Sequence, residues 1–462
     1  MMIKKLLKCS LLMTFAAVSF NVMATHVDVS TARATASNFM NQKLGAKQGM
    51  LMSPASIKLA HTEASKVSGN AYYVFNITGG GWVIVAGDDR AKQVLAYGDK
   101  GNIDMNDLPG NMKDYLNLYK NQIEEMQSYK GEVVPIKTTK RTTVVEPLTK
   151  SIWGQRQPFN LQCPQLSDGY PPVGCGPLAM AQIIYYWKYP ENLPALDDYY
   201  IYQSWMTVPK LPAATLDFSL LLDAYTEWNA AGQLVVLPTT DDQKAEVAKL
   251  CRYCAQACEV RFASSGSGSY TYQQRDAFGK LGFQSDYQLV GIDPAWYCSN
   301  SNKYTQDEWC ALICSELEAG RPLPYHNVDF VDGHAWVLDG VDADGKFHMN
   351  WGWNEKCNGW FEFGAFTVAP NGEDWNFNGS SNEMIINLYP YDGYVIPSAG
   401  FERGDVNQDG FITIDDVTAL INYLLTDDAT GINLDAADCD GIDGITISDV
   451  TALINYLLTD QW

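Results

Sequence analysis

The sequence predicts an α+β protein built from more than one domain. Stretches with the apolar period of helices and stretches of alternating β-branched and aromatic residues occur along the same chain, as in α+β proteins. The chain has 462 residues, more than the roughly 250–300 at which a single hydrophobic core stops growing. A segment at 412–427 recurs at 445–460 with a single change, so a duplicated unit stands near the C-terminal end.

The N-terminal residues 1–24 have the pattern of a cleaved signal peptide. A short basic start precedes an apolar run from Leu11 to Val22, and small residues follow. Cys9 lies before this apolar run, which does not fit a lipid-anchor cysteine, and no later segment has the roughly 20 apolar residues that span a bilayer. The formal charge of −22 argues against a nucleic-acid or anionic-membrane partner, since both need a basic face. We therefore expect an exported protein without a membrane span.

Residues 25–140 are predicted to form a separate N-terminal unit. The pattern indicates a helix over 27–44, paired strands at 72–76 and 80–86, and an amphipathic helix over 112–129. No residue in this unit suggests chemistry. The polar run 137–143 carries basic residues without any apolar period, so it is predicted to be an exposed linker that a protease could cut.

Cys175 is the candidate nucleophile of the central unit. It precedes Pro177, which suits a first helical turn, and a run of residues that is apolar on all sides and predicts a buried helix. A cysteine at a helix N-terminus faces unpaired backbone N–H groups and the positive end of the helix dipole, which favour the thiolate. The alternative is a packed and inert cysteine, because cysteine is among the most buried residue types.

A cysteine nucleophile needs a histidine, and His334 is the best-placed candidate. Strand-like runs at 333–340 and 346–353 are joined by a turn sequence, which predicts a hairpin. If the turn centres near Ala343, His334 lies opposite residue 351 or 352. Asn350 would then orient the imidazole and Trp351 would shield it. His348 would point to the other side, and His326 is less well placed.

The oxyanion of a reacting carbonyl would need two donors near Cys175. The Cys175 N–H is one, and Gly174 and Gly176 leave room for a carbonyl to approach. The side chain of Gln155, in the amide-rich stretch 153–160, is the candidate for the second.

The other cysteines are predicted to be small core hydrophobes. Cys251, Cys254 and Cys258 follow helical spacing, as do Cys310 and Cys314, and neighbours on one helix face are poorly placed for a disulfide. A zinc site is the alternative, but no second CxxC pair or nearby histidine completes a set of four ligands.

Five segments, taken in order, resemble the streptopain family of papain-like cysteine peptidases. They are Trp153-Gly-Gln-Arg-Gln-Pro-Phe-Asn160, Val173-Gly-Cys-Gly-Pro-Leu-Ala-Met-Ala-Gln182, Ser264-Ser-Gly-Ser-Gly-Ser269, Gly333-His-Ala-Trp-Val-Leu-Asp-Gly340 and Asn350-Trp-Gly-Trp353. The resemblance implies a two-lobed papain-like domain over 141–392 that cleaves protein or peptide substrates through an acyl-thioester on Cys175. It also implies that His334 is base and acid, that Gln155 is an oxyanion donor, and that catalysis requires no cofactor.

The N-terminal unit is similar to the propeptide of this family, through the segments 80–90 and 111–115. The resemblance implies that residues 25–140 inhibit the enzyme in cis until they are removed. Two stretches depart from the family pattern: 325–327, just before the histidine strand, and the long insertions between Cys175 and Ser264. Because of them, the specificity pocket cannot be transferred, and the Ser-Gly loop that would wall it could be an ordinary flexible loop.

The repeated unit at 403–462, after a linker at 393–402, contains a candidate calcium loop. Carboxylate or amide oxygens stand at alternate positions before a glycine, with a closing carboxylate at the twelfth position. These ligands are Asp405, Asn407, Asp409 and Asp416. In the second copy Asp438, Asp440 and Asp449 are in register, but Asp443 is displaced by one residue, and Ile442 stands where an oxygen is needed.

This unit resembles a type I dockerin, a small all-α module. The resemblance implies that both loops bind calcium and that the module docks onto a cohesin-type partner. A charged loop without metal is the alternative, above all for the second loop. Together these features predict a secreted cysteine endopeptidase that is made as a zymogen and is attached to a cell surface or to an assembly, such as a polysaccharide-degrading complex.

Two other functions remain open. One is a catalytically inactive, peptidase-like binding subunit of a dockerin-assembled complex, which would have no physical need to keep Cys175, His334, Gln155 and Asn350 together. The other is a transamidase that passes the acyl group to an amine, which the propeptide resemblance disfavours.

Overall fold

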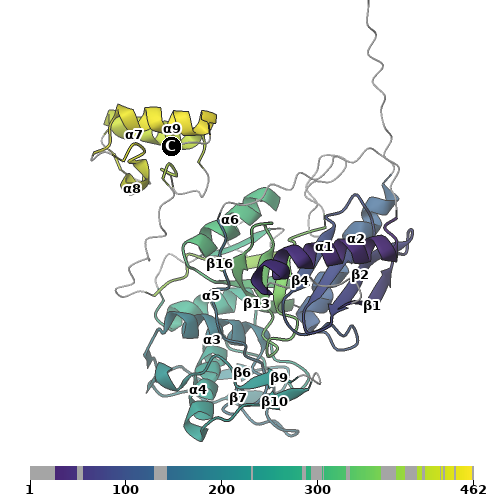
Figure 1. Ribbon diagram of the computed structural model, residues 1–462. Helices are drawn as coiled ribbons and strands as arrows, with labels where there is room; N and C mark the ends of the chain where they lie inside the picture. The colour runs from purple at the N-terminus through teal and green to yellow at the C-terminus, as the bar shows by residue number, and fades with distance from the viewer. Residues whose placement is uncertain are drawn as a thin grey trace, which may run out of the picture.

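The computed structural model describes the folded parts of the chain (Figure 1). These are residues 26–48, 56–129, 143–229, 233–283, 288–292, 304, 306–328, 333–365, 381–390, 403–407, 412–426, 428–429, 432–441 and 444–459. The predicted signal peptide 1–24, the linker 393–402 and nearly all of the linker 137–143 lie outside the described residues. Within the described residues, no helix is both long and apolar enough to cross a membrane.

The N-terminal unit has the helices and strands that the sequence predicts, and two further strands. Its elements are α1 (Val29–Gln48), β1 (Ile57–Ala64), β2 (Asn70–Ile77), β3 (Trp82–Ala86), β4 (Val94–Gly98) and α2 (Gly110–Ser128). The predicted pairing of the strands at 72–76 and 80–86 is confirmed as the antiparallel pair β2–β3. The helix α1 packs on one face of these strands through a small core of its own that includes Ala36, Met40 and Phe75.

The first helix of the central unit is α3, which begins at the candidate nucleophile Cys175. Its longer elements are α3 (Cys175–Trp187), α4 (Asp241–Ala257), α5 (Thr271–Lys280), β11 (Gln288–Ile292), α6 (Gln306–Glu318), β12 (Leu323–Val328), β13 (Gly333–Val341), β14 (Phe347–Asn350), β15 (Gly359–Phe361) and β16 (Ser381–Ile386). Short elements fill the insertion after α3: β5 (Asn192–Leu193), β6 (Tyr199–Ile201), β7 (Met206–Val208), β8 (Ala214–Thr215), the 3-10 turn η2 (Phe218–Leu220), β9 (Thr226–Trp228) and β10 (Leu234–Val236).

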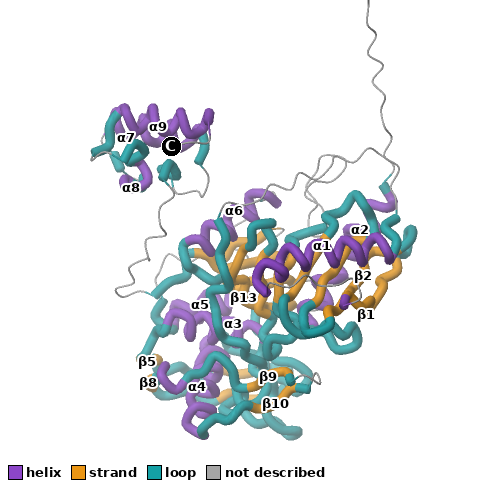
Figure 2. The backbone as a smooth tube through the Cα atoms, viewed as in Figure 1, coloured by secondary structure: helices purple, strands orange, loops and turns teal. Residues whose placement is uncertain are grey.

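One antiparallel sheet runs through both units, with strand order β1-β2-β3-β4-β15-β14-β13-β12-β16-β11. Figure 2 draws its strands in orange and labels β1, β2 and β13. The units join where β15 pairs with β4, with Trp360 opposite Tyr97 and Phe361 opposite Ala96. The sequence predicts a separate N-terminal unit. In the structure its strands instead extend the sheet of the central unit.

The two faces of this sheet carry different cores. On β13, Trp336 and Leu338 belong to a core that includes residues of α2 and α6. Val337, between them, points to the other face and into the core built on α3 and α4. This alternation follows from the two-residue period of a strand. It places the N-terminal unit's helix α2 and the nucleophile helix α3 on opposite faces of the strand that carries His334.

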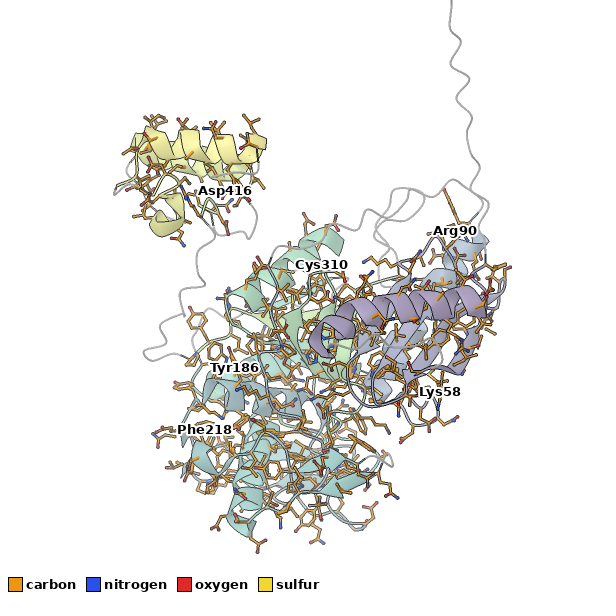
Figure 3. All side chains as sticks on the ribbon, in the orientation of Figure 1. Lys58, Arg90, Tyr186, Phe218, Cys310 and Asp416 are labelled. Atoms are coloured by element: carbon orange, nitrogen blue, oxygen red, sulfur yellow. The ribbon has the colours of Figure 1, made fainter. Side chains whose placement is uncertain are left out.

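The C-terminal unit consists of α7 (Ile414–Thr426), α8 (Leu434–Ala437) and α9 (Ile447–Thr459). Its small core joins equivalent residues of the two copies, Val417 and Leu420 from α7 with Val450 and Leu453 from α9. Figure 3 labels Asp416, which closes the first predicted calcium loop at the start of α7. The duplication in the sequence is therefore a duplication of a loop followed by a helix.

Candidate active site

Cys175 is the first residue of α3. Gly174 before it has a positive φ of 103°, which turns the chain into the helix and is unstrained only for glycine. The sulfur of Cys175 accepts a hydrogen bond from the backbone N–H of Ala335 on β13, with an N–S distance of 3.4 Å. Burial by itself raises the pKa of Cys175, but the hydrogen bond and charge of His334, together with the N–H groups of Ala335 and Gly176, lower this pKa below the ordinary thiol value. The site therefore favours the thiolate.

His334 is the second residue of β13 and contacts two acidic groups. It is hydrogen-bonded to Cys175, and its Nε2 lies 3.2 Å from Oδ2 of Asp114 on α2. Burial lowers the pKa of His334, but Asp114 and the Cys175 thiolate outweigh burial and raise the pKa to about 10. The imidazole is thus a cation held between the thiolate and a carboxylate of the N-terminal unit.

The first turn of α2 lies directly against His334 on β13. A Cβ on Gly110 would stand 3.1 Å from Cε1 of His334. Asn111 donates from Nδ2 to the carbonyl of Trp351 at 3.0 Å. No residue pattern in the N-terminal unit indicated chemistry, so a contact between Asp114 and His334 was not predicted. An aspartate in the first turn of an amphipathic helix has no local feature that would single it out.

Gln155 lies in a chain segment that is hydrogen-bonded to the residues just before Cys175. Its carbonyl accepts from the N–H of Val173, two residues before Cys175, at 2.9 Å. The carbonyl of Trp153 accepts from the N–H of Asn354 at 2.9 Å, which ties the same segment to the end of the histidine hairpin. The side chain of Gln155 is half-buried. The structure therefore brings Gln155 near the loop of Cys175.

The register of the histidine hairpin differs from the expected one. Val341 pairs with Phe347, so the turn centres on Asp344 and not on Ala343, and a register shift follows between Leu338 and Gly340. The strand β14 ends at Asn350, opposite Val337, and the cross-strand partner of His334 is Asn327 on β12. The expectation that His334 lies opposite residue 351 or 352 of this hairpin is wrong.

Asn350 and Trp351 are consequently held by other groups. The Asn350 amide donates to the carbonyl of Ser151 at 2.7 Å and to Oε1 of Gln182 on α3 at 3.1 Å. Trp351 is fully buried against Trp336, with ring centroids 5.0 Å apart. These contacts link the histidine hairpin to α3.

The two other histidines of the central unit have different surroundings. His348 pairs through Nδ1 with Oδ1 of buried Asp339 at 2.6 Å. His326 is 3% exposed, and burial lowers its pKa to about 3. The N-terminal His26 is exposed and His61 is half-buried.

The prediction that the helical cysteines are core residues is confirmed for Cys251, Cys254, Cys258 and Cys314, which are at most 3% exposed. Cys310 on α6 is only partly buried. None of the cysteines among the described residues forms a disulfide.

The C-terminal unit brings three predicted calcium ligands together. Carboxylate oxygens of Asp438, Asp440 and Asp449 lie within 4.8 Å of one another. Asp449 accepts from the N–H groups of Asp440 and Thr446, at 3.0 and 2.7 Å.

The equivalent hydrogen bonds are present in the first copy. Asp416 accepts from the N–H groups of Asn407 and Thr413, at 3.0 and 2.8 Å. The predicted ligands Asp409 and Asp443 lie outside the described residues, whereas Asp405 is described.

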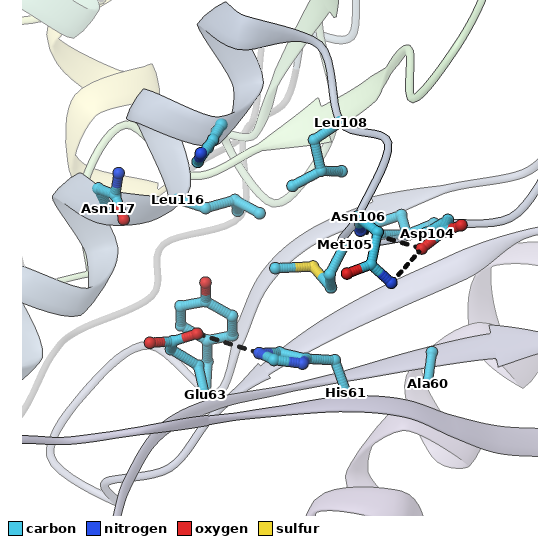
Figure 4. A pocket seen from close by; sticks show the side chains of 12 residues that line it. Ala60, His61, Glu63, Asp104, Met105, Asn106, Leu108, Leu116 and Asn117 are labelled. Atoms are coloured by element: carbon cyan, nitrogen blue, oxygen red, sulfur yellow. Dashed lines mark hydrogen bonds and ion pairs between the residues drawn. The ribbon is translucent and has the colours of Figure 1, made fainter.

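A surface cleft lies in the N-terminal unit, between β1 and α2 (Figure 4). Its volume is about 390 Å³, and its lining includes Glu63, His61, Met105 and Lys113. Lys113 precedes Asp114 on α2, but no predicted site residue lines the cleft.

Three family models match the chain in succession. They are the Spi protease inhibitor over 24–123, the peptidase C10 family over 153–361 and the dockerin type I domain over 403–458. Streptopain of Streptococcus pyogenes is 28% identical over 384 residues, which cover 77% of this chain and 90% of streptopain. The thiol protease/hemagglutinin PrtT of Porphyromonas gingivalis is 25% identical over 388 residues, which cover 80% of this chain and 42% of that protein.

A solved structure shows the same fold. The fragment of prointerpain A from Prevotella intermedia superposes with a TM-score of 0.56 at 22% identity, covering 72% of this chain and 99% of the fragment. The likeness supports a papain-like peptidase fold joined to its propeptide.

Proposed function

We propose that this chain is a secreted, initially latent cysteine endopeptidase of the streptopain (C10) family that acts through Cys175 and carries a Spi-inhibitor-like propeptide and a type I dockerin domain. The observation that carries this proposal is the pairing of Cys175, at the N-terminus of α3, with His334. The proposed domains are 25–140, 141–392 and 403–462, after a signal peptide at 1–24 and with a linker at 393–402.

The chemistry follows from the charges of this pair. The Cys175 thiolate attacks the carbonyl carbon of the scissile bond, and its negative charge passes to the carbonyl oxygen. The Cys175 N–H and the Gln155 amide stabilise that oxyanion. Protonated His334 gives its proton to the leaving amine, which leaves an acyl-thioester. Neutral His334 then takes a proton from water, whose oxygen attacks the thioester and releases the acid and the thiolate.

Latency is proposed to come from the first turn of α2. Asp114 occupies Nε2 of His334, and Asn111 binds the carbonyl of Trp351, so the histidine hairpin is tied to the propeptide. An imidazolium held by a carboxylate is a weaker acid toward the leaving amine, because the carboxylate stabilises the charged form. Removal of residues 25–140 would release both contacts.

The dockerin is proposed to bind calcium in both loops. The clustered carboxylates of Asp438, Asp440 and Asp449 are the hard oxygen ligands that calcium prefers, so the described residues fit the ion. The first loop would use Asp405, Asn407, Asp409 and Asp416, and the second would add Asp443. Bound calcium would supply charge neutralisation and thereby folding energy to this small unit. Catalysis would need no cofactor.

The dockerin also suggests the partner and the location. A cohesin-type protein would hold the peptidase in an extracellular assembly or at a cell surface, where protein substrates are in reach. An inactive binding subunit is the competing function, and the experiment below separates the two.

The test is the Cys175→Ala variant. We expect it to accumulate as unprocessed proprotein and to leave casein intact, because no other described cysteine has a lowered pKa and a histidine partner. His334→Ala should also be inactive, whereas His348→Gln, the matched control, should keep most activity, since His348 pairs with Asp339 instead. Mass spectrometry of casein digests gives the readout. A wild-type protein that leaves casein intact after propeptide removal would favour the inactive subunit.

A further inference from the structure

The two glycines that flank Cys175 are packed against the same segment of the chain. A Cβ on Gly174 would stand 2.9 Å from the carbonyl oxygen of Ser267. A Cβ on Gly176 would stand 2.0 Å from Nε2 of Gln274 on α5, a helix that packs on α3 (Figure 1). Real Cβ atoms do not approach other atoms so closely. The lack of a side chain at both glycines therefore lets this segment touch the backbone on either side of the nucleophile.

The side chain of Gln274 is buried and anchored. It is 1% exposed. Its Nε2 donates to Oγ of Ser269 at 3.4 Å, and Ser269 is hydrogen-bonded to buried Cys258 at the end of α4. The amide of Gln274 is therefore held in place from α4 and α5 while it lies against Gly176 in the first turn of α3.

An amide is an unfavourable choice for this position if its only task is to fill space. Oε1 of Gln274 has no hydrogen-bond partner among the described residues, and burying an unsatisfied oxygen costs free energy. Leucine or methionine would fill a similar volume without this cost. Neither of them has a flat carboxamide, which is thin enough to lie on the Cα of Gly176 without displacing the helix. The flat shape and the hydrogen bond to Ser269 therefore indicate a role in placing the turn.

The first turn of α3 carries the backbone N–H groups that the proposed reaction uses. The N–H of Gly176 stabilises the Cys175 thiolate. The N–H of Cys175 is the proposed first oxyanion donor. Both N–H groups take their direction from the backbone on which Gln274 packs. A small misplacement of such groups is felt strongly in the rate.

We propose that Gln274 is a positioning residue of the active site, which fixes the first turn of α3 so that the N–H groups of Cys175 and Gly176 point at the oxyanion and at the thiolate. This inference rests on the proposed peptidase function and adds a residue to its machinery. Gln274 acts through the turn and not by contact with the substrate, because its side chain is buried.

The experiment compares propeptide-free wild type with Gln274→Met, which keeps the volume and removes the flat amide. On a fluorogenic peptide, kcat should fall about tenfold or more while KM stays within about twofold, because misdirected N–H groups are felt in the transition state. The pH at which half of Cys175 reacts with iodoacetamide, measured by mass spectrometry, should rise by roughly half a unit or more, because the thiolate loses stabilisation.

The charged groups around the thiolate are the same in both proteins. Among the described residues, His334 on β13 is the titratable group that contacts Cys175. Asp114 of α2 pairs with His334 and leaves with the propeptide. A changed alkylation midpoint therefore reports on the backbone donors.

Gln256→Met on α4 is the matched control. Gln256 is 2% exposed, and its amide binds Arg252 and the carbonyl of Asp197, neither of which belongs to the active site. This variant should have a lower melting temperature with kcat and the alkylation midpoint of wild type. If Gln274→Met melts too low to be assayed, Gln274→Leu replaces it with the same expected shifts.

Two results would overturn the positioning role. One is a folded Gln274 variant with unchanged kcat and an unchanged alkylation midpoint, and the other is a loss confined to KM. The absence of any cleavage by wild type refutes the proposed function instead. In that case the alkylation midpoint still tests whether Gln274 places the turn of the nucleophile.

Discussion

At the residue scale, the central finding is that a carboxylate of the propeptide, Asp114, pairs with Nε2 of His334, the proposed catalytic histidine. Asp114 lies 3.2 Å from Nε2 of His334, while the thiolate of Cys175 holds the ring from another side. The sequence predicted Asn350 as the orienting group, but its amide binds Ser151 and Gln182. The carboxylate that contacts His334 thus comes from the propeptide and not from the peptidase domain.

Replacing Asp114 with asparagine should weaken latency. A charge-assisted hydrogen bond in a partly exposed site contributes about 1–1.5 kcal/mol, so inhibition by the propeptide should weaken about tenfold. The raised pKa of His334, about 10, means that the imidazole is charged at lower pH and that the contact is lost as the pH rises through this value. The difference between variant and wild type should therefore be full below the ordinary imidazole pKa of 6.5 and disappear as the pH rises through about 10.

The measurement is the inhibition constant of propeptide variants against mature enzyme. Asp107→Asn is the matched control, because Asp107 forms an exposed ion pair with Lys356 in the same interface. Its effect should stay within about fivefold. Equal effects of the two substitutions would show that Asp114 has no special role.

At the element scale, the sequence predicted those parts whose pattern is local. The apolar run after Cys175 gives α3, and the alternation at 333–340 gives β13. The hairpin register was missed because it depends on the irregularity between Leu338 and Gly340, which no turn sequence specifies.

The continuous sheet could not be predicted either. β15 has only the three residues Gly359–Phe361, too few for a period, and its partner β4 belongs to another unit. Ion pairs reinforce this junction. Lys43 of the propeptide binds Asp342 and Asp344, at 2.7 and 2.9 Å. Lys92 binds buried Glu362 at 2.6 Å. The propeptide therefore docks through strand pairing and charge together.

The isolated unit 25–140 should accordingly inhibit mature enzyme in trans at micromolar concentration or below. Lys92→Met should weaken inhibition more than Lys100→Met does, because the Lys92 side chain is only 16% exposed and its partner Glu362 is buried, whereas Lys100 is 71% exposed. Kinetic titration measures both, with circular dichroism to verify that each variant folds. If wild-type propeptide fails to inhibit at micromolar concentration, the unit is a folding aid and not an inhibitor.

At the scale of the whole molecule, the chain combines a peptidase domain and a propeptide with a C-terminal module that has its own core. The seven buried residues of that core, Val406, Val417, Leu420, Ala437, Cys439, Val450 and Leu453, come only from residues 403–459. So small a core supplies little stability, and a bound metal is the usual supplement. In both loops the closing aspartate, Asp416 or Asp449, accepts a hydrogen bond from the equivalent backbone N–H group. The ligand sequences of the two loops, in contrast, differ.

This difference makes calcium binding by the two loops unequal. The first loop has oxygen ligands at each side-chain position that calcium needs, whereas in the second Asp443 is displaced by one residue. Asp443 reaches the ion only if the backbone rearranges near Gly441 and Gly444, which have positive φ.

In calorimetric titrations of residues 403–462, Asp449→Asn, which keeps the first loop intact, should bind calcium more tightly than Asp416→Asn, which keeps the second. Wild type should lose much of its helical circular dichroism on chelation, since ion binding supplies folding energy. Equal affinities of the two variants would refute the weaker second loop, and full helicity without calcium would refute the coupling of metal to fold.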